Sequence, residues 1–188
     1  MSILGGFNQP RHKVFVSYHH DNDQYYRNLF EHYFGYNYDI MVSKSVQIGD
    51  ISPKISTETI RQKIRDEYLK DSTVTVVLIG AETWKRKHVD WEIGSSIRQT
   101  KYNSRSGLLG IFLPGHPNYG SDRYNPYIIP PRLHYNVKCN YADLYDWNTT
   151  PYKVQSWIDV AFNKRNSVNP DNSYSSFKSN RSGSRWTE

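Results

Sequence analysis

The chain has 188 residues, a length that fits one domain of ordinary size or one domain with a tail. Its net charge of +6 is dispersed, because the densest basic stretch spans only residues 85–87, so the charge does not point to a nucleic-acid partner. With Cys139 as its only cysteine, the chain cannot form an internal disulfide or a metal site built from several thiolates.

The sequence contains no segment that could cross a membrane as a helix. Its longest apolar run, residues 76–79, is far shorter than the ~20 residues that a bilayer requires. The first ten residues lack the apolar centre of a signal peptide. We therefore expect a soluble, cytoplasmic protein with no membrane partner, whose residues 1–11 form a flexible leader.

Predicted strands and helices alternate along the first 113 residues. Runs of β-branched and aromatic residues predict the strands, and apolar residues spaced three and four apart predict the helices. In chain order, the expected elements are a strand at 13–18, a helix from Asp21 or Asn22 to Gly35, a strand at 39–43, a helix from Ser56 to Tyr68, a strand at 73–79, a helix at 87–100 and a strand at 108–113. This order predicts a central parallel sheet with helices on both faces.

The remainder of the chain carries weaker signals. Five prolines and two glycines predict a long irregular loop at 114–131, followed by an edge strand at 137–141 and a closing helix at 152–163. From residue 167 onward Ser, Asn, Arg and Gly predominate, which predicts a disordered tail. We therefore expect one domain at 12–166 and a tail at 167–188.

Three segments are predicted to lie where parallel sheets bind ligands, beyond the carboxyl ends of the strands. They are residues 17–20, 43–50 and 80–92. The chain has neither a Walker loop nor a G-x-G-x-x-G motif for phosphate. The strand at 73–79 does not end in an aspartate, which argues against a response regulator.

Glu92 is the candidate catalytic residue. It precedes the expected core residue Ile93 near the start of a helix, where the helix dipole stabilises a carboxylate by ~0.3–1 kcal/mol. One carboxylate beside a bound sugar can stabilise an oxocarbenium-like transition state. A positively charged leaving group such as nicotinamide needs no acid, although Asp90, Glu82 and Asp50 are candidates for a second carboxylate. The alternative is that Glu92 only complements the helix dipole.

Other side chains at the predicted strand ends also have structural alternatives. Tyr18 and His19 would face Glu92, with Trp84 as an aromatic floor, but Trp84 could equally be packed and His19 simply solvated. Ser17 lacks the G-x-S-x-G turn of a nucleophile, so capping of a turn is the expected role. Two adjacent histidines offer too few ligands for zinc, so no metal site is expected.

Two stretches resemble the sequence motifs of TIR domains. The segment KVFVSY at 13–18 is similar to their opening strand, and residues 73–80, followed by Thr83-Trp84 and then VDWEI at 89–93, are similar to a later box. Together they most resemble the TIR-like subunits of bacterial Thoeris anti-phage systems, over about residues 13–113. Residues 42–45 depart from animal TIR enzymes, which have acidic residues after the second strand.

The resemblance implies a flavodoxin-like three-layer α/β sandwich that cleaves the nicotinamide–ribose bond of NAD, its substrate, and needs no resident cofactor. The product would be a cyclic ADP-ribose isomer or an ADP-ribose conjugate that activates a separate effector on infection. By position, Glu92 would be the catalytic glutamate. The residues expected to bind substrate are Ser17, Tyr18, His19, Ser43, Asp50 and Trp84.

The resemblance also implies contacts with other TIR protomers, because Gly49-Asp50 would lie in the loop through which TIR domains assemble head to tail. A non-catalytic TIR scaffold that acts only by such assembly is one alternative. A second alternative is another flavodoxin-like N-glycosidase, such as a nucleoside deoxyribosyltransferase, which also relies on a glutamate.

Overall fold

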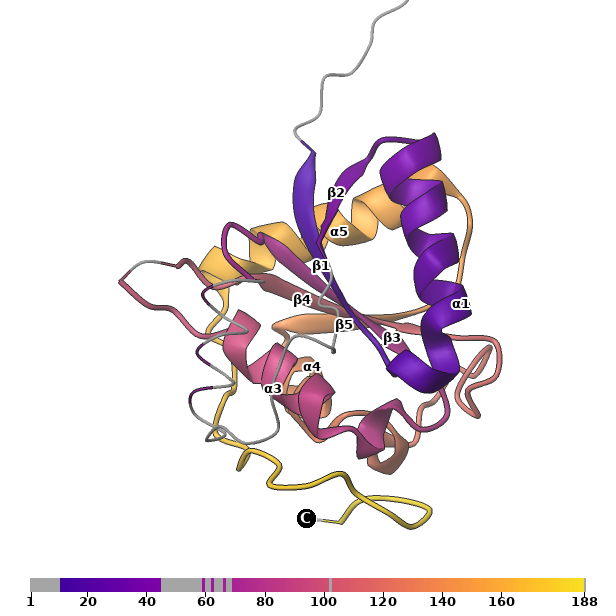
Figure 1. Cartoon of the computed structure of the whole chain (residues 1–188), viewed down its shortest axis with the longest axis vertical. Helices are drawn as coiled ribbons and strands as arrows, with labels where there is room; N and C mark the ends of the chain where they lie inside the picture. The colour runs from indigo at the N-terminus through magenta and orange to yellow at the C-terminus, as the bar shows by residue number, and fades with distance from the viewer. Residues whose placement is uncertain are drawn as a thin grey trace, which may run out of the picture.

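A parallel sheet forms the centre of the computed structural model (Figure 1), which describes residues 11–44, 69–101 and 103–187 together with Thr59, Gln62 and Asp66. Within these residues the sheet has five strands in the order β2-β1-β3-β4-β5, and all neighbours are parallel. The strands are β1 (His12–Ser17), β2 (Met41–Lys44), β3 (Val74–Ile79), β4 (Gly107–Phe112) and β5 (Ala142–Asp146). This strand order is flavodoxin-like, which confirms the expected α/β fold.

Helices cover both faces of the sheet and complete three layers (Figure 1). One face carries α1 (His20–Phe30), its continuation η1 (Glu31–Asn37) and α5 (Pro151–Ser167). The other face carries α3 (Lys87–Ser96) and α4 (Pro131–Lys138). Successive residues of a strand point to opposite faces, so Val76 packs with α1 and α5 while Val77 packs with α3 and α4.

The same alternation in β1 places Ser17 on the face that α3 covers. Val14 and Val16 belong to the apolar cluster with α1 and α5, so Ser17 points the opposite way. β1 and β3 are neighbours, but the chain forms β2 between them, so the strand order reverses at this pair. Such a reversal is where open parallel sheets bind ligands.

Several boundaries in the first half differ from the predicted ones. The first helix begins at His20, because His19 rather than Asp21 or Asn22 is the N-cap: its Nδ1 accepts the backbone N–H of Asn22 at 3.3 Å. The helix continues through Gly35 as η1. The second strand begins two residues later than predicted, and the third helix ends at residue 96 rather than 100. The helix expected from Ser56 to Tyr68 lies largely outside the described residues.

The region after β4 departs most from the prediction. The expected loop contains a short 3-10 helix, η5 (Pro126–Ile128). The edge strand expected at 137–141 is wrong, because α4 runs to Lys138 and the edge strand is β5. Proline stands at the start of α4 and of α5, where its missing N–H costs no helical hydrogen bond. The closing helix α5 is longer than expected at both ends.

The expected tail is packed against the domain rather than disordered. Phe177 is only 5% exposed and Trp186 only 2%. The indole N–H of Trp186 donates to the Ile129 carbonyl at 2.8 Å. Burial of these two aromatic side chains contributes about 1.5–3 kcal/mol each to holding this otherwise polar stretch against the domain.

Candidate active site

The Glu92 carboxyl lies against the end of β1. Ser17 Oγ donates a hydrogen bond to Glu92 Oε2 over 2.6 Å. Both side chains are buried, with Glu92 2% exposed, and within the described part of the chain no cationic side chain pairs with the carboxyl. Burial raises the pKa of Glu92 to about 8, and the Ser17 hydrogen bond opposes that rise only in part. At pH 7 this carboxyl is therefore mainly a neutral acid.

The packing of α3 sets the direction of Glu92. Val89 and Ile93 of this helix are fully buried among side chains of the sheet. Glu92 immediately precedes Ile93, so its side chain leaves the helix at the edge of the packed face, toward β1. The sequence analysis placed Tyr18 and His19 opposite Glu92 and gave Ser17 a turn-capping role, whereas the structure places the Ser17 hydroxyl against the Glu92 carboxyl.

Three rings gather beside this pair, and one of them was missed by the sequence analysis. His88 lies one helical turn before Glu92, and its Nε2 is 3.1 Å from the Tyr18 carbonyl oxygen. The His88 ring meets that of His20 edge-on at 4.8 Å, and His20 stacks on Tyr18 at 4.2 Å. Burial lowers the pKa of both histidines to about 4. At pH 7 they are therefore neutral, and because a carbonyl only accepts, His88 carries its proton on Nε2.

The spacing between His88 and Glu92 alone could have indicated His88, since residues four apart share one side of a helix.

Two of the other predicted substrate-binding residues have structural roles here. His19 caps α1 and is buried, which lowers its pKa. Trp84 lies in η4 (Thr83–Lys85) and is 2% exposed, so its indole is packed rather than open to a ligand. Tyr18 hydroxyl donates to Gln24 Oε1 over 2.7 Å.

None of the candidates for a second carboxylate is shown facing Glu92. Asp90 is buried and paired with Arg132, whose Nε lies 2.9 Å from Asp90 Oδ1. Glu82 is exposed and pairs with Lys85 over 2.6 Å. Asp50 lies outside the described residues. In the described structure none of these candidates is therefore placed beside the Glu92 carboxyl.

A different carboxylate, Asp23, holds the turn that follows β3. Thr83 Oγ1 donates to Asp23 Oδ2 over 3.1 Å, and Thr83 Oγ1 itself accepts the Gly80 N–H at 2.9 Å. A Cβ on Gly80 would lie 2.3 Å from the Asp23 carboxylate oxygens, so this close approach requires glycine. Burial raises the pKa of Asp23. The sequence offered only a weak signal for it, because acidic residues are common in first helical turns.

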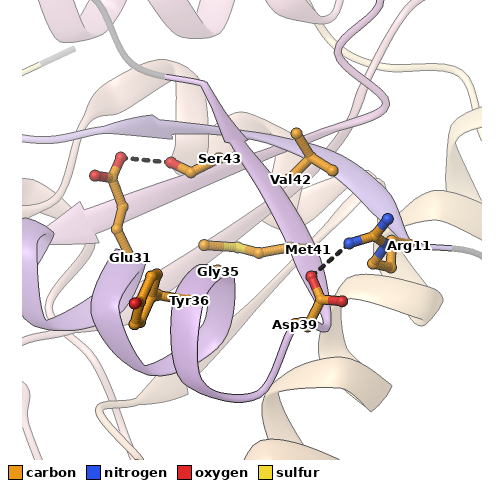
Figure 2. Close-up of a pocket in the computed structure, with 8 residues that line it drawn as sticks. All are labelled: Arg11, Glu31, Gly35, Tyr36, Asp39, Met41, Val42 and Ser43. Carbon is orange, nitrogen blue, oxygen red and sulfur yellow. Dashed lines mark hydrogen bonds and ion pairs between the residues drawn. The ribbon is translucent and has the colours of Figure 1, made fainter.

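Ser43 belongs to a separate cavity on the opposite face of the sheet (Figure 2). It pairs in register with Val14, which points toward α1, and its hydroxyl donates to Glu31. The cavity has a volume of about 360 Å³ and is lined by Arg11, Glu31, Gly35, Tyr36, Asp39, Met41, Val42 and Ser43. The structure therefore does not bring Ser43 together with Glu92.

The described residues contain neither a group of metal-ligating side chains nor a membrane-spanning helix. No cluster of three or more His, Cys, Asp or Glu side chains among them could hold a metal ion. No helix among them is long and apolar enough to cross a bilayer.

Comparison with known proteins gave one family. The model of the family described as Thoeris protein ThsB, TIR-like domain, matches residues 15–118. The match runs from β1 past β4 and includes both Ser17 and Glu92. A comparison with curated proteins gave no match.

Proposed function

Because this chain belongs to the TIR-like domain family of Thoeris protein ThsB, with a TIR-family role in defence, we propose that it is an enzyme that breaks the nicotinamide–ribose bond of NAD. The observation that carries the proposal is the Glu92 carboxyl, buried beside Ser17 where the strand order reverses, without a cationic partner among the described residues. A carboxyl in such a place is available for chemistry rather than committed to an ion pair.

The reaction suits a single carboxylate. When the bond between ribose C1′ and the nicotinamide nitrogen breaks, its electron pair leaves with nicotinamide and neutralises the positive charge of that ring. No proton is needed for departure, so no second acid is required. Positive charge develops on C1′ and the ribose ring oxygen, and an ionised Glu92 would stabilise it.

Glu92 must lose its proton before it can stabilise the positive charge on the ribose. The nicotinamide ring of NAD is positively charged, and a positive charge beside a carboxyl favours the ionised form. Entry of water would act in the same direction, because burial is what raises the pKa of Glu92. The described conformation is thus a resting form, and activity requires that the site open, which we expect on infection.

The product depends on what reaches C1′ after nicotinamide leaves. Water gives ADP-ribose, whereas a nucleophile within the same molecule gives a cyclic isomer and a second bound molecule gives a conjugate. A signalling product requires that water be excluded, and assembly of protomers over the site would achieve this. The cyclic or conjugated nucleotide then activates a separate effector.

The test is mass spectrometry of small molecules from infected cells that express the wild-type chain, Glu92→Gln or Glu82→Gln. Glu82 is an exposed carboxylate ten residues earlier, so its variant is a matched control. We expect an ADP-ribose-derived species with the wild type and Glu82→Gln but not with Glu92→Gln. Equal amounts from all three would contradict the proposal.

One observation favours the alternative of a non-catalytic TIR scaffold. Glu92, Ser17 and Trp84 are all closed off from solvent in this conformation. A scaffold would leave NAD unchanged and produce no new species with any variant, while still assembling with other TIR proteins.

A further inference from the structure

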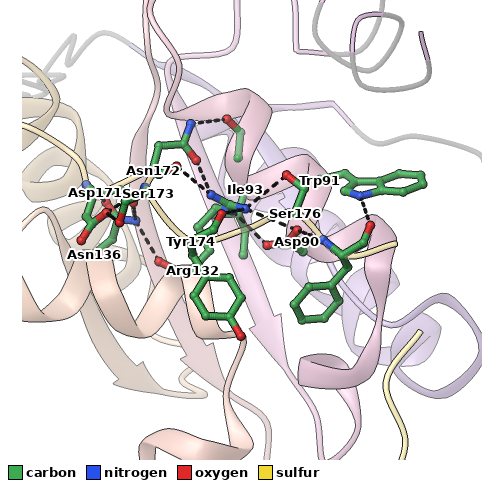
Figure 3. Close-up of polar contacts among 12 residues, drawn as sticks. Asp90, Trp91, Ile93, Arg132, Asn136, Asp171, Asn172, Ser173, Tyr174 and Ser176 are labelled. Carbon is green, nitrogen blue, oxygen red and sulfur yellow. Dashed lines mark hydrogen bonds and ion pairs between the residues drawn. The ribbon is translucent and has the colours of Figure 1, made fainter. Parts of the chain in front are cut away.

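Residues 172–181, here called the strap, run antiparallel along α3, and Figure 3 shows most of this contact. As residue numbers rise along the strap, the residues of α3 that it contacts have falling numbers. Four hydrogen bonds join them: Asn172 Nδ2 to Gly94 O (3.0 Å), Phe177 N to Asp90 Oδ2 (3.0 Å), Trp91 Nε1 to Phe177 O (2.9 Å) and Lys87 N to Asn180 Oδ1 (3.0 Å).

The helix positions in these bonds form a single stripe. Positions 87, 90, 91 and 94 are spaced as i, i+3, i+4 and i+7, so they share one side of α3. Val89 and Ile93 face the sheet on the other side, and Glu92 lies next to Ile93. The helix is therefore held between the sheet and the strap, which fixes its rotation about its own axis.

Arg132 of α4 ties the strap to the helix at a buried point. Its Nε lies 2.9 Å from Asp90 Oδ1, its Nη1 donates to Asn172 Oδ1 over 2.5 Å, and its Nη2 donates to the Tyr174 carbonyl over 2.7 Å. The planar guanidinium holds these acceptors in one fixed geometry. A Cβ on Gly94 would lie 3.1 Å from Arg132 Nε, so the glycine makes room for the arginine.

The strap also supplies the N-terminal cap of α3. Arg86, the residue at the N-cap position, makes no capping hydrogen bond with its side chain. Asn180 takes that role from the strap, accepting the first N–H of the helix at Lys87. The adjacent backbone is fixed as well, because Arg181 N–H donates to the Lys85 carbonyl at 2.7 Å. The strap thus secures both the start and the side of the helix.

We propose that the strap is a positioning element for Glu92, which it keeps opposite Ser17 by holding the outer side of α3. The proposal rests on the catalytic role proposed for Glu92. It concerns a part of the chain that lies beyond residue 118, where the family match ends. The strap bonds α3 at positions 87, 90, 91 and 94 but not at Glu92 itself, so it acts through the helix and not on the reacting atoms.

Two tryptophans allow a matched test in the full chain. Trp91→Phe removes an indole N–H that bonds the strap to α3. Trp186→Phe removes an equivalent indole N–H, which bonds the Ile129 carbonyl at 2.8 Å and lies among the rings of Tyr127, His134 and Tyr174 rather than on α3. The two substitutions are chemically identical, but only Trp91 bonds the strap directly to α3, whereas Trp186 contacts the strap through the Tyr174 ring.

Hydrogen exchange of the α3 amides and a carbon-13 titration of the Glu92 carboxyl are the readouts. We expect Trp91→Phe to speed α3 exchange by about tenfold, the size of one lost buried hydrogen bond, and to lower the pKa of Glu92 from about 8 as water enters. Trp186→Phe should change neither. In infected cells, product formation should fall with Trp91→Phe only, because a carboxyl that is ionised but displaced from its place opposite Ser17 no longer lies beside the reacting ribose.

Equal changes from both variants, or none from Trp91→Phe, would overturn the proposal. If Trp91→Phe does not fold, Asn180→Ala serves in its place, because Asn180 is exposed and its side chain only caps the helix. Exchange and titration need no turnover. A fully active Glu92→Gln would therefore disprove the proposed function while the two readouts still report whether the strap holds α3.

Discussion

Two carboxyl groups two residues apart on α3 have opposite environments. Asp90 and Glu92 are both 2% exposed. Asp90 faces the strap, where it is paired with Arg132 and accepts the Phe177 N–H. Glu92 faces the sheet, where Ser17 donates one hydrogen bond and no cation in the described structure balances it.

The difference separates a structural carboxylate from one that is available for chemistry. A buried charge is stable only when it is paired and fully hydrogen-bonded, and Asp90 meets that condition. Glu92 does not, and it avoids the cost of a buried charge by keeping its proton at pH 7. One side of α3 therefore anchors the helix, and the other presents a buried carboxyl without a cationic partner in the described structure.

Loss of the Glu92 carboxyl should have the largest effect. Glu92→Gln keeps the shape of the side chain and its hydrogen bond with Ser17, but it cannot stabilise positive charge. We expect product formation to fall at least ~100-fold, the loss typical when one electrostatic contact to a transition state is removed. The measurement is product per infected cell by mass spectrometry, with thermal unfolding to verify the fold. A folded variant with full activity would contradict the assignment.

Breaking the ion pair between Asp90 and Arg132 should mainly lower the stability of the fold. Arg132→Met leaves the Asp90 carboxylate buried without its cation, a change that costs about 3–5 kcal/mol of unfolding free energy. Urea denaturation measures this loss. The double variant Asp90→Asn with Arg132→Met removes both charges and should recover part of the stability. A loss of under ~1 kcal/mol in the single variant would show that the pair is not buried as described.

The pH dependence of stability should distinguish the two carboxyls further. The folded-state pKa of Glu92, about 8, lies above its ordinary value of 4.5, so the folded protein binds a proton that the unfolded chain releases between these values. The contribution of Glu92 to stability is therefore greatest below pH 4.5 and declines as the pH rises to about 8. Each pKa unit corresponds to ~1.4 kcal/mol.

Urea denaturation from pH 5 to 9 would test this dependence. Relative to the wild type, Glu92→Gln should become more stable as the pH rises. Parallel curves for the two proteins would mean that Glu92 is ionised in the folded state. Because only the difference in unfolding free energy between the two proteins is used, the contributions of other titrating groups such as Asp23 cancel.

Ser17→Ala should have the smallest effect. The Ser17 hydrogen bond lowers the pKa of Glu92 against the larger effect of burial, so its removal should raise that pKa further. The cost in unfolding free energy should be about 1 kcal/mol, the value of one hydrogen bond. Titration of the carboxyl in the variant measures the shift, and a downward shift would mean that water replaces the hydroxyl.

The first half of the fold was predictable because its signals are local. The alternation of β-branched strands with periodic helices is contained within short windows, and the rule for parallel strand ends placed segments 17–20 and 80–92, which contain Ser17 and Glu92, at the same edge of the sheet. The burial of Trp84 was left open by the sequence, because it depends on the η4 turn that Asp23 and Gly80 hold.

The strap and α4 were not predictable, because local sequence signals there are weak or misleading. The strap contains one large buried apolar residue, Phe177, among polar residues, so its composition resembles that of a disordered tail. Its order comes from partners far away in the sequence, since Phe177 of the strap and its partner Asp90 are 87 residues apart. In α4 two prolines at its start suggested a loop, although proline is well tolerated in the first turn of a helix.

Titration of the Glu92 carboxyl in the wild-type chain tests the central claim most directly. The full-length protein, labelled with carbon-13 at glutamate carboxyls and assigned by comparison with Glu92→Gln, would be followed from pH 4 to 10. A midpoint near 8 is the result expected for a buried carboxyl held without a cation. A midpoint near 4.5 would show an ionised, solvated or ion-paired group, and the contrast between Asp90 and Glu92 would not hold.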